Sequence, residues 1–251
     1  MTAQSAITAA PLQRLQVPRR EWGAAYAALK RLLADKDSTE NVFEIMRALN
    51  GASTRDGYYK LLTTAEGGRL AYRQEDLAAK LSDRAWLATM PPGSLGAVYR
   101  DFTDNGGVTP DGLVEVSNQV MTYIEHPIAW FGRRIRDSHD LWHVVTGYGL
   151  DSLGEACLVA FSYPQTKALG WAFIAVGAAV KSRQAPERHP YVAAIREGYA
   201  RGRQAAWLPA QDWVALLPQP LEAVRAQLGL APPATYLSIP LAARGSAVPK
   251  D

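Results

Sequence analysis

The chain has 251 residues, of which 48% are hydrophobic and 20% are charged, and its formal net charge is +3. This composition is that of a folded protein with a sizeable core, and it excludes a disordered chain, a collagen-like repeat and a coiled-coil rod. A single cysteine, Cys157, excludes a disulfide scaffold and a multi-cysteine zinc module, and it suits a reducing compartment. The net charge is too small to indicate nucleic-acid binding, so no nucleic-acid partner is predicted.

Residues 1–20 lack the continuous apolar stretch of a signal peptide. They contain three arginines and no acidic residue, as mitochondrial transit peptides do, but an ordinary disordered tail has the same composition. Pro11 and Pro18 interrupt any amphipathic helix in this stretch, which favours the tail. We therefore predict a flexible N-terminal tail over residues 1–20, with the transit peptide as the alternative.

Helical spacing of apolar residues predicts a series of helices after this tail. The first has an apolar stripe formed by Trp22, Tyr26, Leu29 and Leu33. The second has the stripe Val42, Ile45, Met46 and Leu49, and Asn50-Gly51 ends it. A third begins after the candidate N-cap Ser94, carries Leu95, Val98, Tyr99 and Phe102, and ends at Gly106-Gly107.

The rest of the chain continues this helical pattern, with only a weak alternation at Leu113 to Ser117. The most apolar window, Ala168 to Val180, is shorter than the roughly 20 residues that a membrane-spanning helix needs, so we predict a buried helix. A last helix is indicated by Val224, Leu228 and Leu230. We predict a single all-α domain over residues 21–231 and a flexible C-terminal tail over residues 232–251.

The segment from Pro127 to Phe161 carries the candidate site. Pro127 fits the first turn of a helix, and Gly147-Tyr148-Gly149 would end that helix. Along it, one i, i+4 row is formed by Phe131, Ile135, His139 and His143. Both histidines extend an apolar row, so we expect them to face inward.

A second helix follows the glycine turn, with Asp151 or Ser152 as its N-cap and Glu155 in its first turn. A short turn between antiparallel helices would bring Glu155 back towards His139 and His143, with Asp140 on the flank of the same face. Two imidazoles and two carboxylates suit zinc and would also accept iron or manganese. The sequence therefore predicts a metal-binding helical hairpin.

Each of these residues also has a structural interpretation. Histidines at i, i+4 on a helix are more often structural than metal-binding. Asp140 can pair with Arg136 at i, i+4, and Glu155 can be a first-turn acid favoured by the helix dipole. The residues alone leave the choice between a metal site and a structural cluster open.

The spacing His139-Asp140-x-x-His143, followed after eleven residues by Glu155, is similar to the signature of the ubiquinone (coenzyme Q) biosynthesis Coq-four family. The similarity covers roughly residues 40–230. Further stretches that resemble family motifs are Pro91–Gly96 with Tyr99 and Phe102, Asp137–Tyr148, and Pro220–Leu230 with Trp207 and Trp213. One departure is the stretch AWLPAQDWVALLPQPLE, which has fewer acidic residues than the family motif.

The resemblance implies an all-α protein, dimeric and attached peripherally to a membrane assembly of other ubiquinone-biosynthesis proteins. It implies four metal ligands, His139, Asp140, His143 and Glu155, with zinc as the usual ion. The implied reaction removes the ring carboxylate of a polyprenylated 4-hydroxybenzoate-derived intermediate, either simply or oxidatively, with a hydroxyl replacing the carboxylate. Asp140 is our candidate for the acid or base that moves the proton.

A lipid substrate also predicts a membrane-facing surface. The apolar stretch Ala168 to Val180 is followed by Lys181, Arg183, Arg188, Arg196, Arg201 and Arg203, against Glu187 and Glu197. An apolar helix beside a basic patch can lie on an anionic bilayer, although a core helix or a dimer interface would bury the same residues. We expect a peripheral membrane location on the bacterial cytoplasmic face or on the matrix side of the mitochondrial inner membrane.

Two other functions compete with a decarboxylase. One is a non-catalytic organiser that binds prenyl lipids and recruits other ubiquinone-biosynthesis proteins, with the metal site as a structural staple. The other is an all-α phosphohydrolase, which would need further histidine and aspartate ligands. The only other histidines are His126 and His189, each of which precedes a proline.

Overall fold

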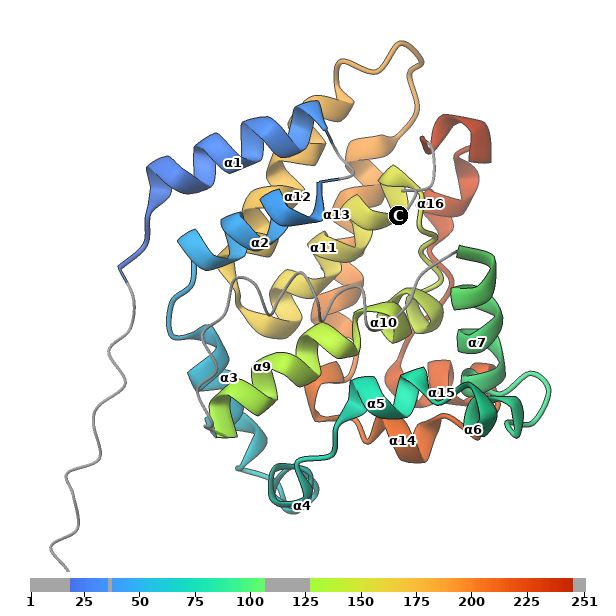
Figure 1. Cartoon of the computed structure of the whole chain (residues 1–251). Coiled ribbons are helices and arrows are strands. Elements are labelled where there is room, and N and C mark those ends of the chain that lie inside the picture. Colours follow the sequence, from blue (N-terminus) through green and yellow to red (C-terminus); the bar gives the residue numbers. More distant parts are fainter. Residues whose placement is uncertain (1–18, 36–37, 107–126, 246–251) are drawn as a thin grey trace, which may run out of the picture.

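The computed structural model describes residues 19–35, 38–106 and 127–245 (Figure 1). Within these ranges the regular elements are helices, and the only bridge between extended residues joins Ser94 to Pro220. The all-α prediction is confirmed. The weak alternation at Leu113 to Ser117 and residues 1–18 of the predicted tail lie outside the described residues.

Helices α1 (Trp22–Ala34) and α2 (Thr39–Ala48) pack side by side, and the Glu21 amide before α1 donates to the Ala48 carbonyl at 2.7 Å. The apolar stripe predicted for α1 is wrong at two positions, because Trp22 is 53% exposed and Tyr26 is 60% exposed. Leu29 of the predicted stripe is buried, together with Ala25, Ala28 and Leu32. Small side chains on this face let α1 approach its neighbours closely, whereas the two aromatic side chains point outward.

Four short helices follow, namely α3 (Ser53–Leu61), α4 (Ala65–Arg73), α5 (Leu77–Ser82) and α6 (Arg84–Ala88). With α9 (Pro127–Asp137), α3 and α4 enclose a small second core. Its buried residues are Leu61, Leu70, Ala71, Trp130 and Phe131. Figure 1 shows α3, α4 and α9 in the lower half of the molecule.

Helix α7 (Leu95–Gly106) begins where the sequence predicts. The Ser94 hydroxyl accepts from the Ala97 amide at 3.2 Å, which is the expected N-cap bond. Gly93, before the cap, has a φ of +75°, and its carbonyl accepts from the Leu221 amide at 3.0 Å. This bond ties the turn to α15 (Leu221–Leu228).

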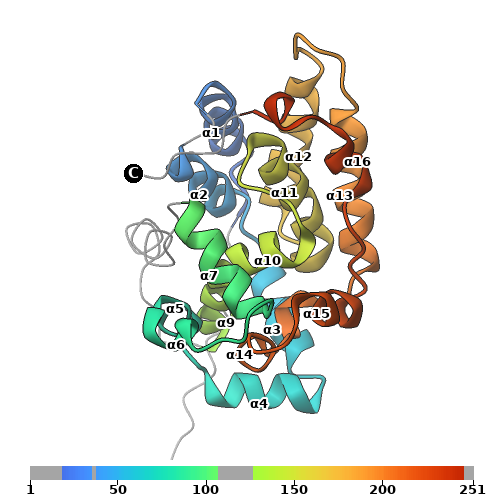
Figure 2. The ribbon, with the colours of Figure 1, turned by 90° about the vertical axis from the view of Figure 1, so that its right-hand side faces the viewer.

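The main core surrounds α11 (Ser152–Thr166), which lies against α12 (Leu169–Ser182) and α13 (Tyr191–Gln204) (Figure 2). Gly198 and Gly202 let α13 approach α11 closely, because a Cβ at either position would clash with a carbonyl oxygen of α11. These oxygens belong to Cys157 and Phe161. The two helices therefore pack at a distance that larger side chains would not allow.

Helix α12 is only partly buried, which corrects the prediction of a buried helix. Its buried residues are Gly170, Ile174, Ala175 and Gly177. Val176 is 63% exposed and Val180 is 55% exposed. No helix within the described ranges combines the length and the apolarity needed to cross a membrane.

The basic patch predicted after α12 is smaller than expected, because Arg201 is engaged by the fold. Its guanidinium donates to the Thr146 carbonyl at 2.8 Å and lies 4.9 Å from the centroid of the Tyr148 ring. Glu197 is likewise used internally, because its carboxylate accepts from the Thr235 amide at 3.0 Å.

After the short helices η1 (Leu208–Ala210) and α14 (Trp213–Leu216), the chain continues through α15 to α16 (Ala234–Ser238) and η2 (Leu241–Ala243). We expected a flexible tail over residues 232–251, but Pro233, Tyr236 and Ile239 are buried, and residues 246–251 lie outside the described residues. Tyr236 is 2% exposed and Ile239 is fully buried. The expectation fails because the hydroxyl of Tyr236 finds polar partners inside the fold, which allows the whole ring to be buried.

Candidate metal centre

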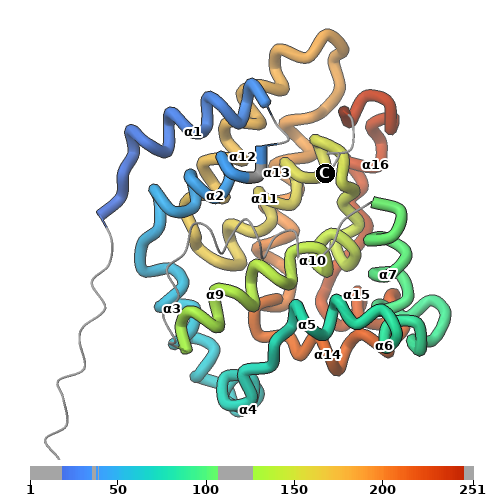
Figure 3. The backbone as a smooth tube through the Cα atoms, in the orientation of Figure 1, coloured from blue at the N-terminus to red at the C-terminus, as the bar shows by residue number. Residues whose placement is uncertain are grey.

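The predicted single helix from Pro127 to Gly147 is wrong in one respect, because the structure divides it at Ser138 into α9 and α10 (His139–Thr146). Figure 3 shows α9 passing directly into α10. The Ser138 hydroxyl donates to the Ile135 carbonyl at 3.0 Å, an acceptor that the His139 amide would use in an unbroken helix. His139 is therefore the first residue of a new helix. Gly147 ends α10 as predicted, with a φ of +78°.

The turn between α10 and α11 is fixed by side chains. Asp151 is the N-cap of α11, and its Oδ1 accepts from the Gly154 amide at 2.8 Å. Its Oδ2 accepts from the Tyr236 hydroxyl, and that hydroxyl accepts from the Gly149 amide at 3.0 Å. Helix α16 therefore holds the turn that sets the direction of α11.

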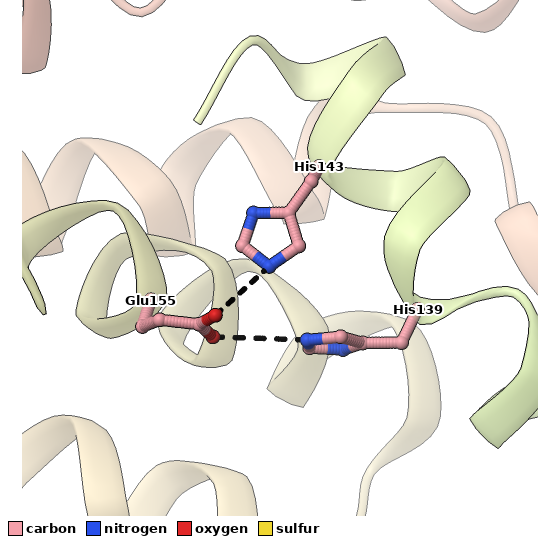
Figure 4. Close-up of side chains that lie close together, drawn as sticks. All are labelled: His139, His143 and Glu155. Atoms are coloured by element: carbon pink, nitrogen blue, oxygen red, sulfur yellow. Dashed lines mark ion pairs between the residues drawn. The ribbon is translucent and has the colours of Figure 1, made fainter. Parts of the chain in front are cut away.

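The side chains of His139, His143 and Glu155 converge between the two helices (Figure 4). The Nε2 atom of His143 lies 3.3 Å from Oε1 of Glu155, and the Nε2 atom of His139 lies 3.7 Å from Oε2. One ligand atom of each residue lies within 4.8 Å of the others, a separation that one cation can span. The prediction that α11 returns Glu155 to both histidines is confirmed, and their role as ligands stays a prediction.

The hydrogen bonding of His143 defines what its free nitrogen can do. Nδ1 lies 3.1 Å from the Tyr148 carbonyl, which can only accept, so Nδ1 carries the hydrogen. In the neutral ring, Nε2 then presents a lone pair towards an oxygen of Glu155. Two acceptors face each other across this gap, and a cation, either a proton or a metal ion, satisfies both.

The charges in the cluster favour the same arrangement. Burial lowers the pKa of His143, but the Glu155 carboxylate, helped by Asp140 and the Tyr148 carbonyl, raises this pKa above its ordinary value. Burial raises the pKa of Glu155, but His143 and His139 hold this pKa well below its usual range. The cluster is therefore built around a carboxylate that needs a positive charge beside it.

Asp140 lies beside this cluster rather than in it. It is 3% exposed, and its Oδ1 atom is buried without a hydrogen-bond partner among the described residues. A buried carboxylate oxygen without a donor is costly unless a nearby positive group balances its charge. Arg136, the alternative partner considered for Asp140, pairs instead with Asp137 at 2.7 Å. The structure thus brings together three of the four predicted ligands and leaves Asp140 next to them.

Two aromatic rings form walls of the cluster. Phe102 of α7 stacks on His143 with ring centroids 5.8 Å apart, and Trp171 of α12 stacks on His139 with centroids 6.3 Å apart. Sequence reasoning missed Trp171 as a site residue, because spacing within one helix does not show which distant ring it contacts. The side chain of Glu155 is 29% exposed, so solvent reaches one side of the cluster.

The donor set fits a divalent metal ion. Two imidazoles and one carboxylate are the ligands of many catalytic zinc sites, which keep a position open for water or substrate, and iron or manganese accepts the same donors. Nε2 of His143 and Oδ1 of Asp140 are buried and have no hydrogen-bond partner among the described residues, so they are the atoms that such an ion would compensate. The residues present therefore fit a bound ion, and they do not distinguish among these metals.

The phosphohydrolase interpretation finds no second group of ligands within the described ranges. His189 is bonded to Glu187 at 2.9 Å, and that carboxylate is 73% exposed. His126 lies outside the described residues. The histidines and acids that such an enzyme needs on other helices are therefore not brought together in the part of the chain that the structure describes.

Comparisons with known proteins point to one family. The model of the family described as "Coenzyme Q (ubiquinone) biosynthesis protein Coq4" matches residues 24–234. The chain is 25% identical over 174 residues to ubiquinone biosynthesis protein coq4, mitochondrial, of Botryotinia fuckeliana, covering 69% of this chain and 60% of that protein. It is 32% identical over 123 residues to ubiquinone biosynthesis protein COQ4, mitochondrial, of Yarrowia lipolytica, covering 46% and 45%. The matches thus span less than two thirds of the length of these relatives.

A solved structure shares the fold. It is the crystal structure of a protein from Nostoc punctiforme that carries a provisional assignment to ubiquinone biosynthesis. The TM-score is 0.57 at 22% sequence identity, with 84% of this chain and 99% of that chain covered. At this identity the likeness concerns the helical fold alone.

Proposed function

The chain belongs to the Coq4 family of coenzyme Q (ubiquinone) biosynthesis proteins, and we propose that it acts in this pathway as a metal-dependent carbon–carbon lyase. Its substrate in this proposal is a polyprenylated 4-hydroxybenzoate-derived intermediate, which loses the carboxylate at ring carbon C1. The observation that carries the proposal is the convergence of His139, His143 and Glu155 on one point with a donor set that fits a divalent ion.

The three converging residues would hold the ion, most commonly zinc with such donors, with iron or manganese as alternatives. A divalent ion bound there supplies a Lewis acid that can hold a carboxylate and stabilise negative charge on a ring oxygen. The Tyr148 carbonyl orients His143 by accepting from its Nδ1, so Nε2 is kept available for the ion. Phe102 covers one face of the His143 imidazole, and Trp171 covers one face of the His139 imidazole. Both rings limit the access of water to the cluster.

Asp140 is the group that we assign to proton movement. When CO2 leaves an aromatic carbon, that carbon must gain a proton, and aromaticity is lost transiently on the way. Asp140 is buried beside the cluster, and its Oδ1 is not committed to a hydrogen bond of the fold. In this proposal the carboxylate takes up a proton and passes it to the ring carbon. In the oxidative form of the proposal, the carboxylate leaves as CO2 and water supplies the hydroxyl that replaces it on the ring carbon. Dioxygen accepts the two electrons and the protons that are released, and it becomes hydrogen peroxide.

The prenyl tail of the substrate requires a surface that accepts lipid. Trp22 and Tyr26 of α1 and Val176 and Val180 of α12 are exposed. Their exposure supports peripheral contact with a membrane, where aromatic and apolar side chains gain from burial. We further propose a homodimer that associates with other ubiquinone-biosynthesis proteins. The relatives named as mitochondrial favour a mitochondrial location, for which we propose the matrix side of the inner membrane. The cytoplasmic face of a bacterial membrane is the other location proposed.

The decisive experiment is mass spectrometry of a polyprenylated 4-hydroxybenzoate incubated with the purified chain, after its metal content has been measured, with and without oxygen. Loss of CO2 alone supports the simple lyase. Loss of CO2 with an oxygen-dependent gain of one oxygen atom supports the oxidative form and a redox-active metal. An unchanged lipid that stays bound to metal-loaded protein would replace the lyase with the non-catalytic organiser.

A further inference from the structure

A cavity of about 290 Å³ lies away from the histidine–glutamate cluster. Its walls come from the segment before α1, the start of α3 and the turn between α11 and α12. Glu155 is in the first turn of α11, whereas Lys167 in this cavity follows the last residue of that helix. Twelve helical residues correspond to about 18 Å along the axis, so the two sites are distinct.

Three cationic side chains line the cavity, those of Arg20, Lys60 and Lys167. The one acidic residue in its wall, Asp56, pairs with Arg55 at 3.0 Å and has a side chain that is 61% exposed. Among the described residues, none of the three cations has a carboxylate within ion-pair distance. The cavity therefore gathers positive charge that the fold itself does not neutralise.

The fold holds two of these cations at the wall. The Nζ atom of Lys60 lies 4.1 Å from the centroid of the Trp207 ring, a cation–π contact that restricts its position. Trp207 is itself fixed, because its Nε1–H donates to the Gln165 carbonyl at 2.7 Å. The guanidinium of Arg20 lies against Gly51, where a Cβ would come within 3.2 Å of Nη2.

Lys167 also lines the cavity, and its charge acts on Lys60. Burial and the charge of Lys167 both lower the pKa of Lys60, which indicates that the two ammonium groups repel each other in this wall. Lys167 also has a left-handed backbone, with a φ of +59°, a region that favours glycine. An anion between the two lysines would remove their repulsion.

The backbone adds to this positive surface. Helix α3 begins at Ser53, and its N-cap residue, Ala52, has no side chain that can accept from the first amides. Both residues line the cavity. The amides at a helix N-terminus carry partial positive charge and commonly bind phosphate groups when no side chain caps them.

We propose that this cavity is a binding site for a phosphate group, carried either by an anionic lipid headgroup or by a soluble phosphate ester. A phosphate carries enough charge and enough acceptor oxygens to meet one guanidinium and two ammonium groups at once. The lipid source is favoured by the two helices that start beside the cavity. Helix α1 presents Trp22 and Tyr26, and α12 presents Val176, all exposed, so a headgroup in the cavity would have apolar neighbours for its chains.

The soluble arm of the test is calorimetric titration of the metal-free full chain with glycerol 3-phosphate. The cavity variants are Lys60→Gln and Lys167→Gly, and the second relieves the left-handed backbone, so it keeps the fold. Each removes one charged contact, so we expect the affinity to fall about fivefold to tenfold. The matched control is Lys80→Gln, because the Lys80 ammonium lies 5.5 Å from the centroid of the Trp86 ring, outside this cavity. This variant should bind glycerol 3-phosphate as tightly as the unaltered chain does.

The lipid arm is cosedimentation with phosphatidylcholine vesicles that contain or lack phosphatidic acid. Weaker binding of both cavity variants to the acidic vesicles, with the Lys80 variant unchanged, supports a lipid headgroup. If the cavity variants bind glycerol 3-phosphate more weakly but bind the acidic vesicles as before, the ligand is a soluble phosphate ester. If the cavity variants bind both glycerol 3-phosphate and the acidic vesicles as the unaltered chain does, the site is refuted. It is also refuted if Lys80→Gln weakens binding equally. Because metal-free protein is used, this result is independent of lyase activity.

Discussion

The Tyr236 hydroxyl donates a hydrogen bond to Asp151, the residue that caps the helix carrying Glu155. The two residues are 85 positions apart in the chain, and their bond is buried. The same hydroxyl accepts from the Gly149 amide, so one side chain of α16 holds both the turn and the cap. The position of Glu155 opposite the two histidines therefore depends on a segment close to the C-terminus.

Removing this hydroxyl should destabilise the fold and loosen the cluster. In Tyr236→Phe, the Gly149 amide loses its acceptor and the Asp151 carboxylate loses a donor in a buried setting. We expect the free energy of unfolding to fall by about 1–3 kcal/mol, measured by chemical denaturation. Zinc affinity should fall as well, because α11 is held less firmly. Tyr72→Phe is the control, since Tyr72 is 90% exposed, and equal effects of both substitutions would contradict this account.

The close contact of α11 with α13 gives a second prediction. In Gly198→Ala, the new Cβ meets the Cys157 carbonyl oxygen, so backbone must move and we expect a loss of about 1–3 kcal/mol in the free energy of unfolding. The matched control is Gly23→Ala in α1, where the added Cβ has no atom within 4 Å beyond the neighbouring residues and the backbone of its own helix. There the substitution should stabilise the helix by up to about 1 kcal/mol. If both substitutions lower the free energy of unfolding, the close contact of α11 with α13 is not the reason for the effect of Gly198→Ala.

The sequence predicted those features of the site that depend on local spacing. Short-range rules predicted that His139 and His143 lie one helical turn apart and that Gly147 ends the helix. They also gave Asp151 as one of two candidates for the cap of the next helix, and the structure has Asp151. These rules also placed Glu155 opposite the histidines, because a short turn leaves few other directions.

Features that depend on distant partners could not be predicted in this way. Tyr236 follows a proline-rich stretch that is typical of a tail, and only its contact with Asp151 explains its burial. Trp171 stacks on His139 from another helix. The division at Ser138 depends on a single hydroxyl that replaces a backbone bond, and the periodicity of apolar residues continues across it.

Loss of one imidazole should remove the metal ion. For His143→Ala we expect zinc affinity to fall by more than the roughly 10–100-fold that is typical of losing an outer partner of a metal ligand. Decarboxylation should be lost in parallel. Metal content by mass spectrometry and turnover are measured together, with His189→Ala as the control, because His189 bonds to Glu187 away from the cluster. Unchanged turnover in metal-free His143→Ala would refute the metal mechanism.

Asp140→Asn separates a metal ligand from a proton-moving group. The amide keeps the shape of the side chain but cannot deliver a proton as a carboxyl group does. We expect bound metal to be retained and kcat to fall by about 10²–10⁴-fold, the usual contribution of a general acid or base. If the variant instead loses its metal, Asp140 is the fourth ligand that the family resemblance implies.

The pH dependence of stability follows from the shifted pKa values of His143 and Glu155. Because the pKa of His143 is raised in the folded metal-free protein, its protonated form stabilises the fold. This contribution is complete below the ordinary histidine pKa and is lost as the pH rises through the raised value. The pKa of Glu155 is lowered, so its contribution is present above the ordinary glutamate pKa and is lost as the pH falls through the lowered value.

We therefore expect the free energy of unfolding of the metal-free chain to decrease as the pH rises above neutrality, measured by denaturation at a series of pH values. Bound zinc replaces the proton beside Glu155, so the zinc-loaded chain should keep its stability over this range and lose zinc at acidic pH, where protons compete for the imidazoles. His143→Ala should remove the alkaline decrease. The same decrease in that variant would assign the effect to groups outside the cluster and contradict the proposed coupling between His143 and Glu155.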